Sequence, residues 1–151
     1  MKDINITVKK DDVYEEVAKT SAYIGGKNVD GNGSSLYDKV FVTDVDKEML
    51  ERFWQDALNS ISFLVSGILS HTDVDDDGNY AMWLMLPENF QMAQLPSLHS
   101  TIINYVENAI ITEWCNVSAK DEVTAYAEQA AALLKQVKNI IYSRRRPIRN
   151  F

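Results

Sequence analysis

The longest segment with a clean helical period runs from Thr43 to Ser70, and it constrains the fold more than any other part of the chain. Apolar residues recur at helical spacing on one side and polar residues fill the other, which predicts an amphipathic helix of roughly 40 Å. Thr43 and Asp46 have the spacing of a capping box at its start. A helix this long needs partners for its apolar side, whose residues are Leu50, Phe53, Trp54, Ala57, Leu58, Ile61, Leu64, Val65 and Ile68.

Two short segments have the composition of β-strands. Ile4–Val8 alternates and is β-branched, which predicts a short edge strand. The apolar run Tyr80–Leu86, ended by Pro87, populates both faces of a strand or hairpin arm, so we expect it to be covered on both sides or to lie in a subunit contact. The acidic residues 71–80 before it are expected to form a loop.

Three further helices are predicted from caps and periodicity. The first opens at a capping box of Asp12 and Glu15 and stops at Gly25 and Gly26. The second covers about 97–115 and is apolar except for a narrow polar stripe, which places it centrally. The third covers about 119–143 and opens at a capping box of Ser118 and Asp121, so it runs antiparallel to the second. The polar stripe consists of Thr101, Asn104, Asn108 and Thr112.

Together these elements predict a mainly α protein. We expect an antiparallel helix bundle of about three long helices plus one short N-terminal helix, with a small β element near 80–86 and a short strand at 4–8. Residues 1–143 would form a single domain, which suits a chain of 151 residues. Within it, the Gly-, Asn- and Ser-rich residues 27–39 predict a mobile loop, and residues 144–151 a basic C-terminal arm.

The net charge of −7 is unevenly distributed. Removing the four arginines of the last eight residues from the 15 basic side chains leaves 11 against 22 acidic ones, a net charge of −11. A body this acidic repels nucleic acid at long range, so a nucleic-acid contact is expected only at the arm. We expect an identical acidic neighbour to be the simpler partner of the arm, because arginine pairs bidentately with carboxylates. The arginines are Arg144, Arg145, Arg146 and Arg149, flanked by Tyr142 and Phe151.

The start of the chain and its single cysteine, Cys115, bear on the compartment. One cysteine excludes an internal disulfide framework and fits a reducing cytoplasm. No signal peptide follows the first methionine, and no segment has the unbroken apolar length of a membrane span. We therefore expect a soluble protein that stays inside the cell and does not contact membranes.

The Asp-rich segment is the best candidate for a metal site. Asp73, Asp75 and Asp77 followed by Gly78 match the first half of a calcium loop, but Leu84 stands where the closing glutamate belongs. An acidic connection between two elements explains these residues equally, so we expect no metal there. The sequence predicts no cofactor and no enzyme. His71, His99 and Cys115 have no partner at catalytic spacing, and the sequence singles out no pair of carboxylates that could act as general acid and base.

The aromatic residues are expected in packing contacts. Trp54 and Trp114 fall on inward stripes, so burial in the core is predicted for both. Trp83 and Tyr80, in the apolar run, are the candidates for a subunit contact, together with the arm residues Arg144–Arg146, Arg149 and Phe151.

The order of elements resembles the helical head-to-tail connector proteins of tailed bacteriophages. The resemblance lies in DKEMLERFWQDALNSI, a following β element, then LPENF and LPSLHSTIINYVENAIITEW, between about Thr43 and Trp114. The closing YSRRRPIRNF is similar to the basic tails of phage and prophage proteins. The N-terminal strand and helix and the long last helix depart from the simplest members.

This resemblance implies a non-enzymatic virion protein. Such connectors form a homo-oligomeric ring at the head-tail junction, contact the portal and other neck or tail proteins, and surround the channel through which DNA passes without sequence-specific binding. It would be assembled in the host cytoplasm. Two alternatives remain open: an acidic protein-binding module of the immunity, inhibitor or DNA-mimic type, and a calcium-binding domain built on Asp73–Asp77.

Overall fold

The computed structural model describes residues 2–27, 44–118 and 120–142. The predicted loop beyond Lys27, the cap at Thr43 and the basic arm lie outside these residues. Where it is described, the chain is mainly helical with a small three-stranded antiparallel sheet, so the mainly α prediction is confirmed. The elements are β1 (Lys2–Val8), α1 (Lys10–Lys27), α3 (Asp44–Leu64), β2 (Leu69–Val74), β3 (Tyr80–Leu86), α4 (Leu95–Ser118) and α5 (Val123–Ile141), with 3₁₀ turns at Met92–Gln94 and Lys120–Glu122.

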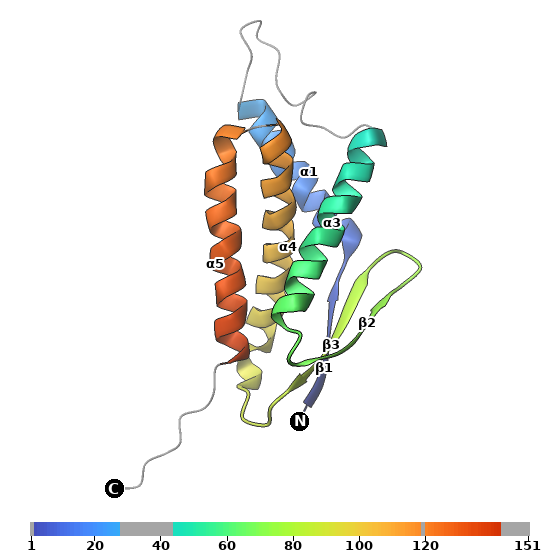
Figure 1. The fold of residues 1–151 in the computed structure, drawn as a ribbon, viewed down its shortest axis with the longest axis vertical. Coiled ribbons are helices and arrows are strands. Elements are labelled where there is room, and N and C mark those ends of the chain that lie inside the picture. The colour runs from blue at the N-terminus through green and yellow to red at the C-terminus, as the bar shows by residue number, and fades with distance from the viewer. Residues whose placement is uncertain (1, 28–43, 119, 143–151) are drawn as a thin grey trace, which may run out of the picture.

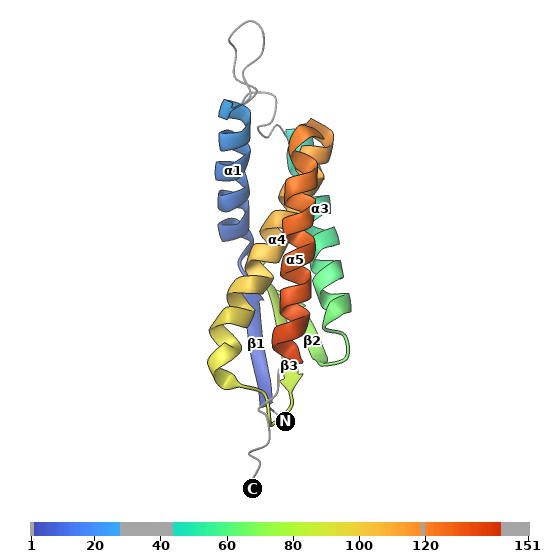
Figure 2. The same cartoon turned by 90° about the vertical axis from the view of Figure 1, so that its left-hand side faces the viewer.

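Helix α4 is the central element, as predicted. It packs against α5, α3 and α1, and the helices run along the long axis of the molecule (Figure 1, Figure 2). Three of its polar stripe residues bond to the backbone one turn earlier, for example Thr101 Oγ1 to the Ser97 carbonyl at 2.6 Å, and so satisfy their polar groups on an apolar helix. Trp54 and Trp114 are buried in the single hydrophobic core that the described elements share, which confirms the burial predicted for both, and Cys115 is buried in the same core.

The sheet has the order β1-β3-β2, with both neighbours antiparallel to β3. The strand predicted at 4–8 is therefore confirmed, and it is an edge strand. Along β3 the residues alternate: one face carries three fully buried side chains toward the helices, and the opposite face carries partly exposed ones. Helices cover only the inner face in the described chain, so the predicted cover on both sides is not observed. The buried residues of β3 are Met82, Leu84 and Leu86.

The prediction of a single helix from Thr43 to Ser70 is wrong at its C-terminal end. Helix α3 stops at Leu64, and a turn closed by the bond from Ile68 N–H to the Val65 carbonyl leads into β2. Val65 stays buried in that turn, so the inward stripe continues although the helix does not. The backbone of residues 69–74 instead pairs with β3, and the expected loop at 71–80 is in fact a strand and a tight hairpin turn. The hydrogen bonds between β2 and β3 therefore determine the structure here, although the sequence has helical periodicity up to Ser70.

Two of the predicted caps are also wrong. Helix α1 begins at Lys10, before Asp12, and its Lys10 N–H donates to Asn79 Oδ1 at 3.0 Å, so the cap comes from the distant β2–β3 turn. The helix also continues through both glycines to Lys27. Helix α5 has Glu122 at its N-cap, without a side-chain bond, after a 3₁₀ turn. A tertiary contact at α1 and a 3₁₀ turn at α5 therefore take the place of the capping boxes that the sequence spacing predicts.

Candidate interaction surfaces

The Asp-rich segment forms the turn of the β2–β3 hairpin. Asp75 Oδ1 accepts from the N–H groups of Asp77 and Asn79, both at 2.9 Å, and its Oδ2 accepts from Asn79 Nδ2 at 3.0 Å. The backbone hydrogen bond from Asn79 is the main cause that lowers the pKa of Asp75. Gly78 has a φ of +84°, a conformation that disfavours side chains. The carboxylate of Asp75 thus stabilises the hairpin turn through these hydrogen bonds.

The three aspartates do not converge on a common point for a cation. Asp73 Oδ1 accepts from its neighbour Val74 N–H, away from the bonds of Asp75. Across the described ranges, no group of three or more His, Cys, Asp or Glu is arranged to hold a metal ion. The predicted absence of a metal at Asp73, Asp75 and Asp77 stays a prediction, since the turn accounts for Asp75 without one.

A polar junction joins this turn to α1 and α3. The Lys10 ammonium forms an ion pair with Glu51 and lies 5.5 Å from the centre of the Tyr14 ring. Tyr14 donates to Glu51 Oε2 at 3.0 Å and packs edge-on against Trp54. Burial opposes ionisation of Glu51, but the hydrogen bonds from Lys10 and Tyr14 outweigh it and lower its pKa. We call the contacts of Lys10, Tyr14, Glu51 and Asn79 the polar junction.

The outer face of the sheet carries an aromatic stack in which His71 is exposed and Trp83 is half-buried. His71 of β2 lies parallel to Trp83 of β3, with ring centres 4.2 Å apart. On the other side of Trp83 the register places Asn5 of β1. Tyr80 instead faces α3, where its hydroxyl is 2.6 Å from Ser62 Oγ. Of the two residues predicted for a subunit contact, only Trp83 therefore lies on an uncovered face.

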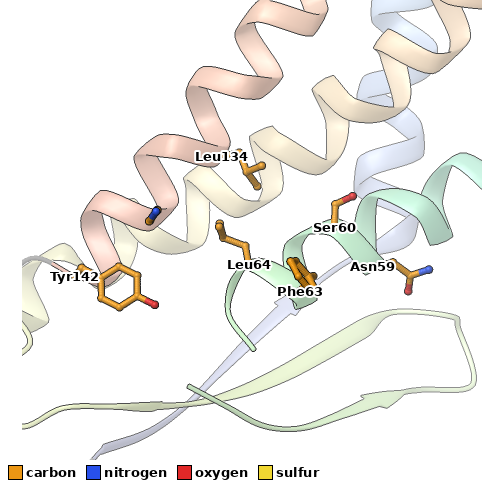
Figure 3. Close-up of a pocket in the computed structure, with 7 residues that line it drawn as sticks. Asn59, Ser60, Phe63, Leu64, Leu134 and Tyr142 are labelled. Carbon is orange, nitrogen blue, oxygen red and sulfur yellow. The ribbon is translucent and has the colours of Figure 1, made fainter. Parts of the chain in front are cut away.

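A second open surface lies between α3 and α5. Phe63 and Leu64 at the end of α3 line a hollow of about 750 Å³ together with Leu134 of α5 and Tyr142, which follows α5 (Figure 3). The Phe63 side chain is 83% exposed and that of Tyr142 is 54% exposed, which is unusual for large apolar groups. Lys138 also lines this hollow. We call it the apolar end of the α3/α5 groove.

The groove continues along the helices into a smaller hollow of about 220 Å³. Ser60 lines both hollows, so they meet on α3. Here α4 forms part of the lining through Tyr105 and Ala109, and two exposed carboxylates, Asp56 and Glu113, stand at the edge. Among the described residues neither carboxylate has an ion pair. We call this part the acidic end of the groove.

Acidic side chains also gather where α1 packs on α4. Glu107 of α4 is partly buried beside Glu16 and Asp12 of α1. Burial and, to a lesser degree, these two carboxylates raise the pKa of Glu107 to about 7. Lys19 is close to Glu15, at 3.5 Å, and to Glu16, at 3.6 Å, on the exposed side of α1. This surface suits a cationic partner.

Two further reactive side chains, Cys115 and His99, lie on α4. Burial raises the pKa of the Cys115 thiol to about 11, so the thiolate is scarce at neutral pH. His99 Nε2 lies 3.1 Å from the Thr7 carbonyl, and so links α4 to the edge strand β1. His71 and His99 are both exposed. No helix in the part of the chain that the structure describes is long and apolar enough to cross a membrane.

The sequence did not identify Phe63, the residue that defines the groove. Phe63 follows Ser62 and lies on the side of α3 where polar residues predominate. The one sequence feature that could have indicated an exposed apolar site is therefore a phenylalanine on the polar side of an amphipathic helix. The His71–Trp83 stack was missed because the strand at 69–74 was read as helix and loop. The predicted arm residues Arg144–Arg146, Arg149 and Phe151 lie outside the described residues.

Comparison of the chain with protein-family models, with curated proteins and with solved structures found no match.

Proposed function

We propose that this protein is a non-enzymatic structural subunit that assembles into a ring, as a connector at the head-tail junction of a tailed phage virion. In this proposal α3, α4 and α5 form an antiparallel bundle that makes the wall of the ring. The subunit contacts other copies of itself and a portal, neck or tail protein. DNA passes through the channel without sequence-specific binding.

The observation that carries the proposal is the presence of two separate open surfaces. The α3/α5 groove exposes Phe63, and the outer sheet face carries the stack of the exposed His71 on the half-buried Trp83. A subunit in a closed ring must contact its neighbouring subunits and also the next protein layer, so it needs more than one interaction surface. An inhibitor that binds one partner needs only one such surface. Apolar side chains gathered at a hollow on the surface are a feature of many interaction sites.

The charge distribution agrees with a channel-lining role. The body of the chain carries a net charge of −11 once the four arginines of the arm are set aside. A negative wall repels the phosphate backbone, so DNA would slide through the ring rather than bind to it.

The mass of the full chain in solution tests the proposal. Light scattering at micromolar concentrations should give a discrete multiple of the 17.1 kDa chain mass, and electron microscopy should show closed rings. Phe63→Asp should reduce assembly while leaving the helical circular dichroism signal intact, because the side chain is 83% exposed. A chain that is monomeric at all these concentrations would contradict the ring.

The acidic surface on α1 favours a second candidate, an acidic protein-binding module. Asp12 and Glu16 lie beside Glu107, and the exposed Asp11 and Glu15 extend the same negative charge. Such a module should be a monomer that binds one basic protein, with binding that falls as salt concentration rises. Reversing Asp11 and Glu15 to lysine should then abolish binding, whereas it should leave a ring intact.

A further inference from the structure

We infer that the α3/α5 groove is the docking site for residues 143–151 of a second copy of this chain. The inference rests on the proposed function, because it names the contact that joins neighbouring subunits in the ring. It concerns the groove alone and leaves the outer face of the sheet to the next protein layer.

The groove has two chemically different ends. At the apolar end, Phe63, Leu64, Leu134 and Tyr142 surround the larger hollow. At the acidic end, Asp56 and Glu113 stand beside small side chains of α4 and α5, which leave room for a chain to lie close to the helices. A ligand that fits must therefore present positive charge at one end and an apolar side chain at the other. The small residues at the acidic end include Ala57, Ala109, Ala127 and Ala130.

The C-terminal segment has these two properties in the required order. Arg144–Arg146 come first, and Ile148 and Phe151 follow after Pro147, with one further arginine, Arg149, between them. Proline disfavours helix here and favours an extended strand. From Arg144 to Phe151 an extended chain spans roughly 23 Å at about 3.3 Å per residue. From Ala127 to Tyr142, which line the two ends, α5 spans roughly 22 Å at about 1.5 Å per residue.

The direction of the segment favours a second copy over the same chain. The described structure ends at Tyr142, which itself lines the apolar end. A segment folding back from there would place Arg144–Arg146 beside Lys138 and Phe151 beside the carboxylates, so charges and apolar groups would be mismatched. A segment from another copy that enters at the acidic end pairs arginines with Asp56 and Glu113 and places Phe151 against Phe63.

Two charge-reversed full-length variants test the contact. The tail variant carries Arg144→Glu, Arg145→Glu and Arg146→Glu, and the groove variant carries Asp56→Arg and Glu113→Arg. Each variant alone should lose assembly by roughly tenfold or more, because like charges then meet in the groove. An equimolar mixture should assemble again. In the mixture each reversed tail meets a reversed groove, and each native tail meets a native groove.

A matched control reverses two other exposed carboxylates. Asp121→Arg with Glu128→Arg changes the net charge by the same amount as the groove variant, but neither residue lines the groove. This control should assemble like the native chain, and all variants should keep the native circular dichroism signal. Loss of assembly in the control as well would overturn the inference, since net charge alone would then explain the result.

The outcomes separate the docking site from the ring function. If the native chain forms rings and the tail and groove variants also do, the groove contact is wrong and the ring stands. If each variant is monomeric and the mixture does not assemble, the segment binds its own groove and the second-copy contact is wrong. If the native chain is itself monomeric, both the contact and the ring are wrong.

Discussion

Helix α3 borders two regions that differ in whether their polar and apolar groups find partners within the described structure. Toward α1 and the hairpin, the polar junction satisfies its own groups: Glu51 bonds both Lys10 and Tyr14, and Asn79 caps α1. Toward α5, the groove leaves Phe63 exposed and its carboxylates without ion pairs in the described structure. The first region needs no further component, whereas the second has the apolar area and unpaired charge that a partner would complete.

The largest expected effect compares two positions on α3. Leu58 is 2% exposed and Phe63 is 83% exposed, although they lie little more than one turn apart. Leu58→Asp should unfold the protein, because an unpaired buried carboxylate costs several kcal/mol against a total stability of about 5 to 15 kcal/mol. Phe63→Asp should leave thermal unfolding of the monomer nearly unchanged. Equal melting temperatures for the two variants would show that the buried and open sides of α3 are misplaced.

These two positions also show what sequence pattern can and cannot reveal. The helical period identified Leu58 and its stripe correctly, because burial of an amphipathic helix leaves a local signal. It could not reveal that α5 leaves Phe63 exposed, since the spacing of two helices depends on how both pack on α4. The groove is therefore a tertiary property.

The region around the polar junction and the β2–β3 hairpin was harder to predict in detail. The sequence predicts helix to Ser70 and a loop from residue 71, whereas pairing with β3 makes residues 69–74 a strand. The cap on Lys10 comes from Asn79, 69 residues away, so no local motif could identify it. By contrast, the mainly α class and the central position of α4 follow from long segments whose periodicity is strong.

The next effect concerns Glu107, on the side of α4 that faces α1. Burial and the charges of Glu16 and Asp12 raise its pKa from 4.5 to about 7 in the folded protein. The folded state thus binds a proton more tightly, and this contribution to stability is complete below about pH 4.5 and lost as the pH rises to 7. Glu107→Gln should raise the free energy of unfolding at pH 8 by about 1.5 kcal/mol after allowance for solvent screening.

Denaturant unfolding of this variant at several pH values provides the measurement. The gain of Glu107→Gln over the native protein should shrink as the pH falls from 8 to 4.5. Glu113→Gln, an exposed carboxylate on the same helix, controls for the loss of one negative charge. A gain that is constant with pH would contradict the assignment of the raised pKa to Glu107.

A smaller effect is expected in the polar junction. Asn79→Ala removes the acceptor for Lys10 N–H and the amide that donates to Asp75. Loss of a helix cap costs about 1 kcal/mol, so the melting temperature should fall by about 2 to 4 °C. Asn139→Ala, on the exposed side of α5, should have little effect. If Asn79→Ala melts like the native protein, the hairpin turn does not cap α1 in solution.

The smallest expected effect is that of calcium on the hairpin turn. Both carboxylate oxygens of Asp75 already accept hydrogen bonds within the turn, and Leu84, at the position of the closing glutamate, is buried. Calcium at 1 mM should therefore leave the melting temperature unchanged. A site with a Kd of about 10 μM would instead add about 2.7 kcal/mol of stability at that concentration, a rise of about 5 °C or more. Such a rise, reversed by a chelator and lost in Asp77→Asn, would show that the turn binds calcium and would make the hairpin, rather than the groove, the region that needs a ligand.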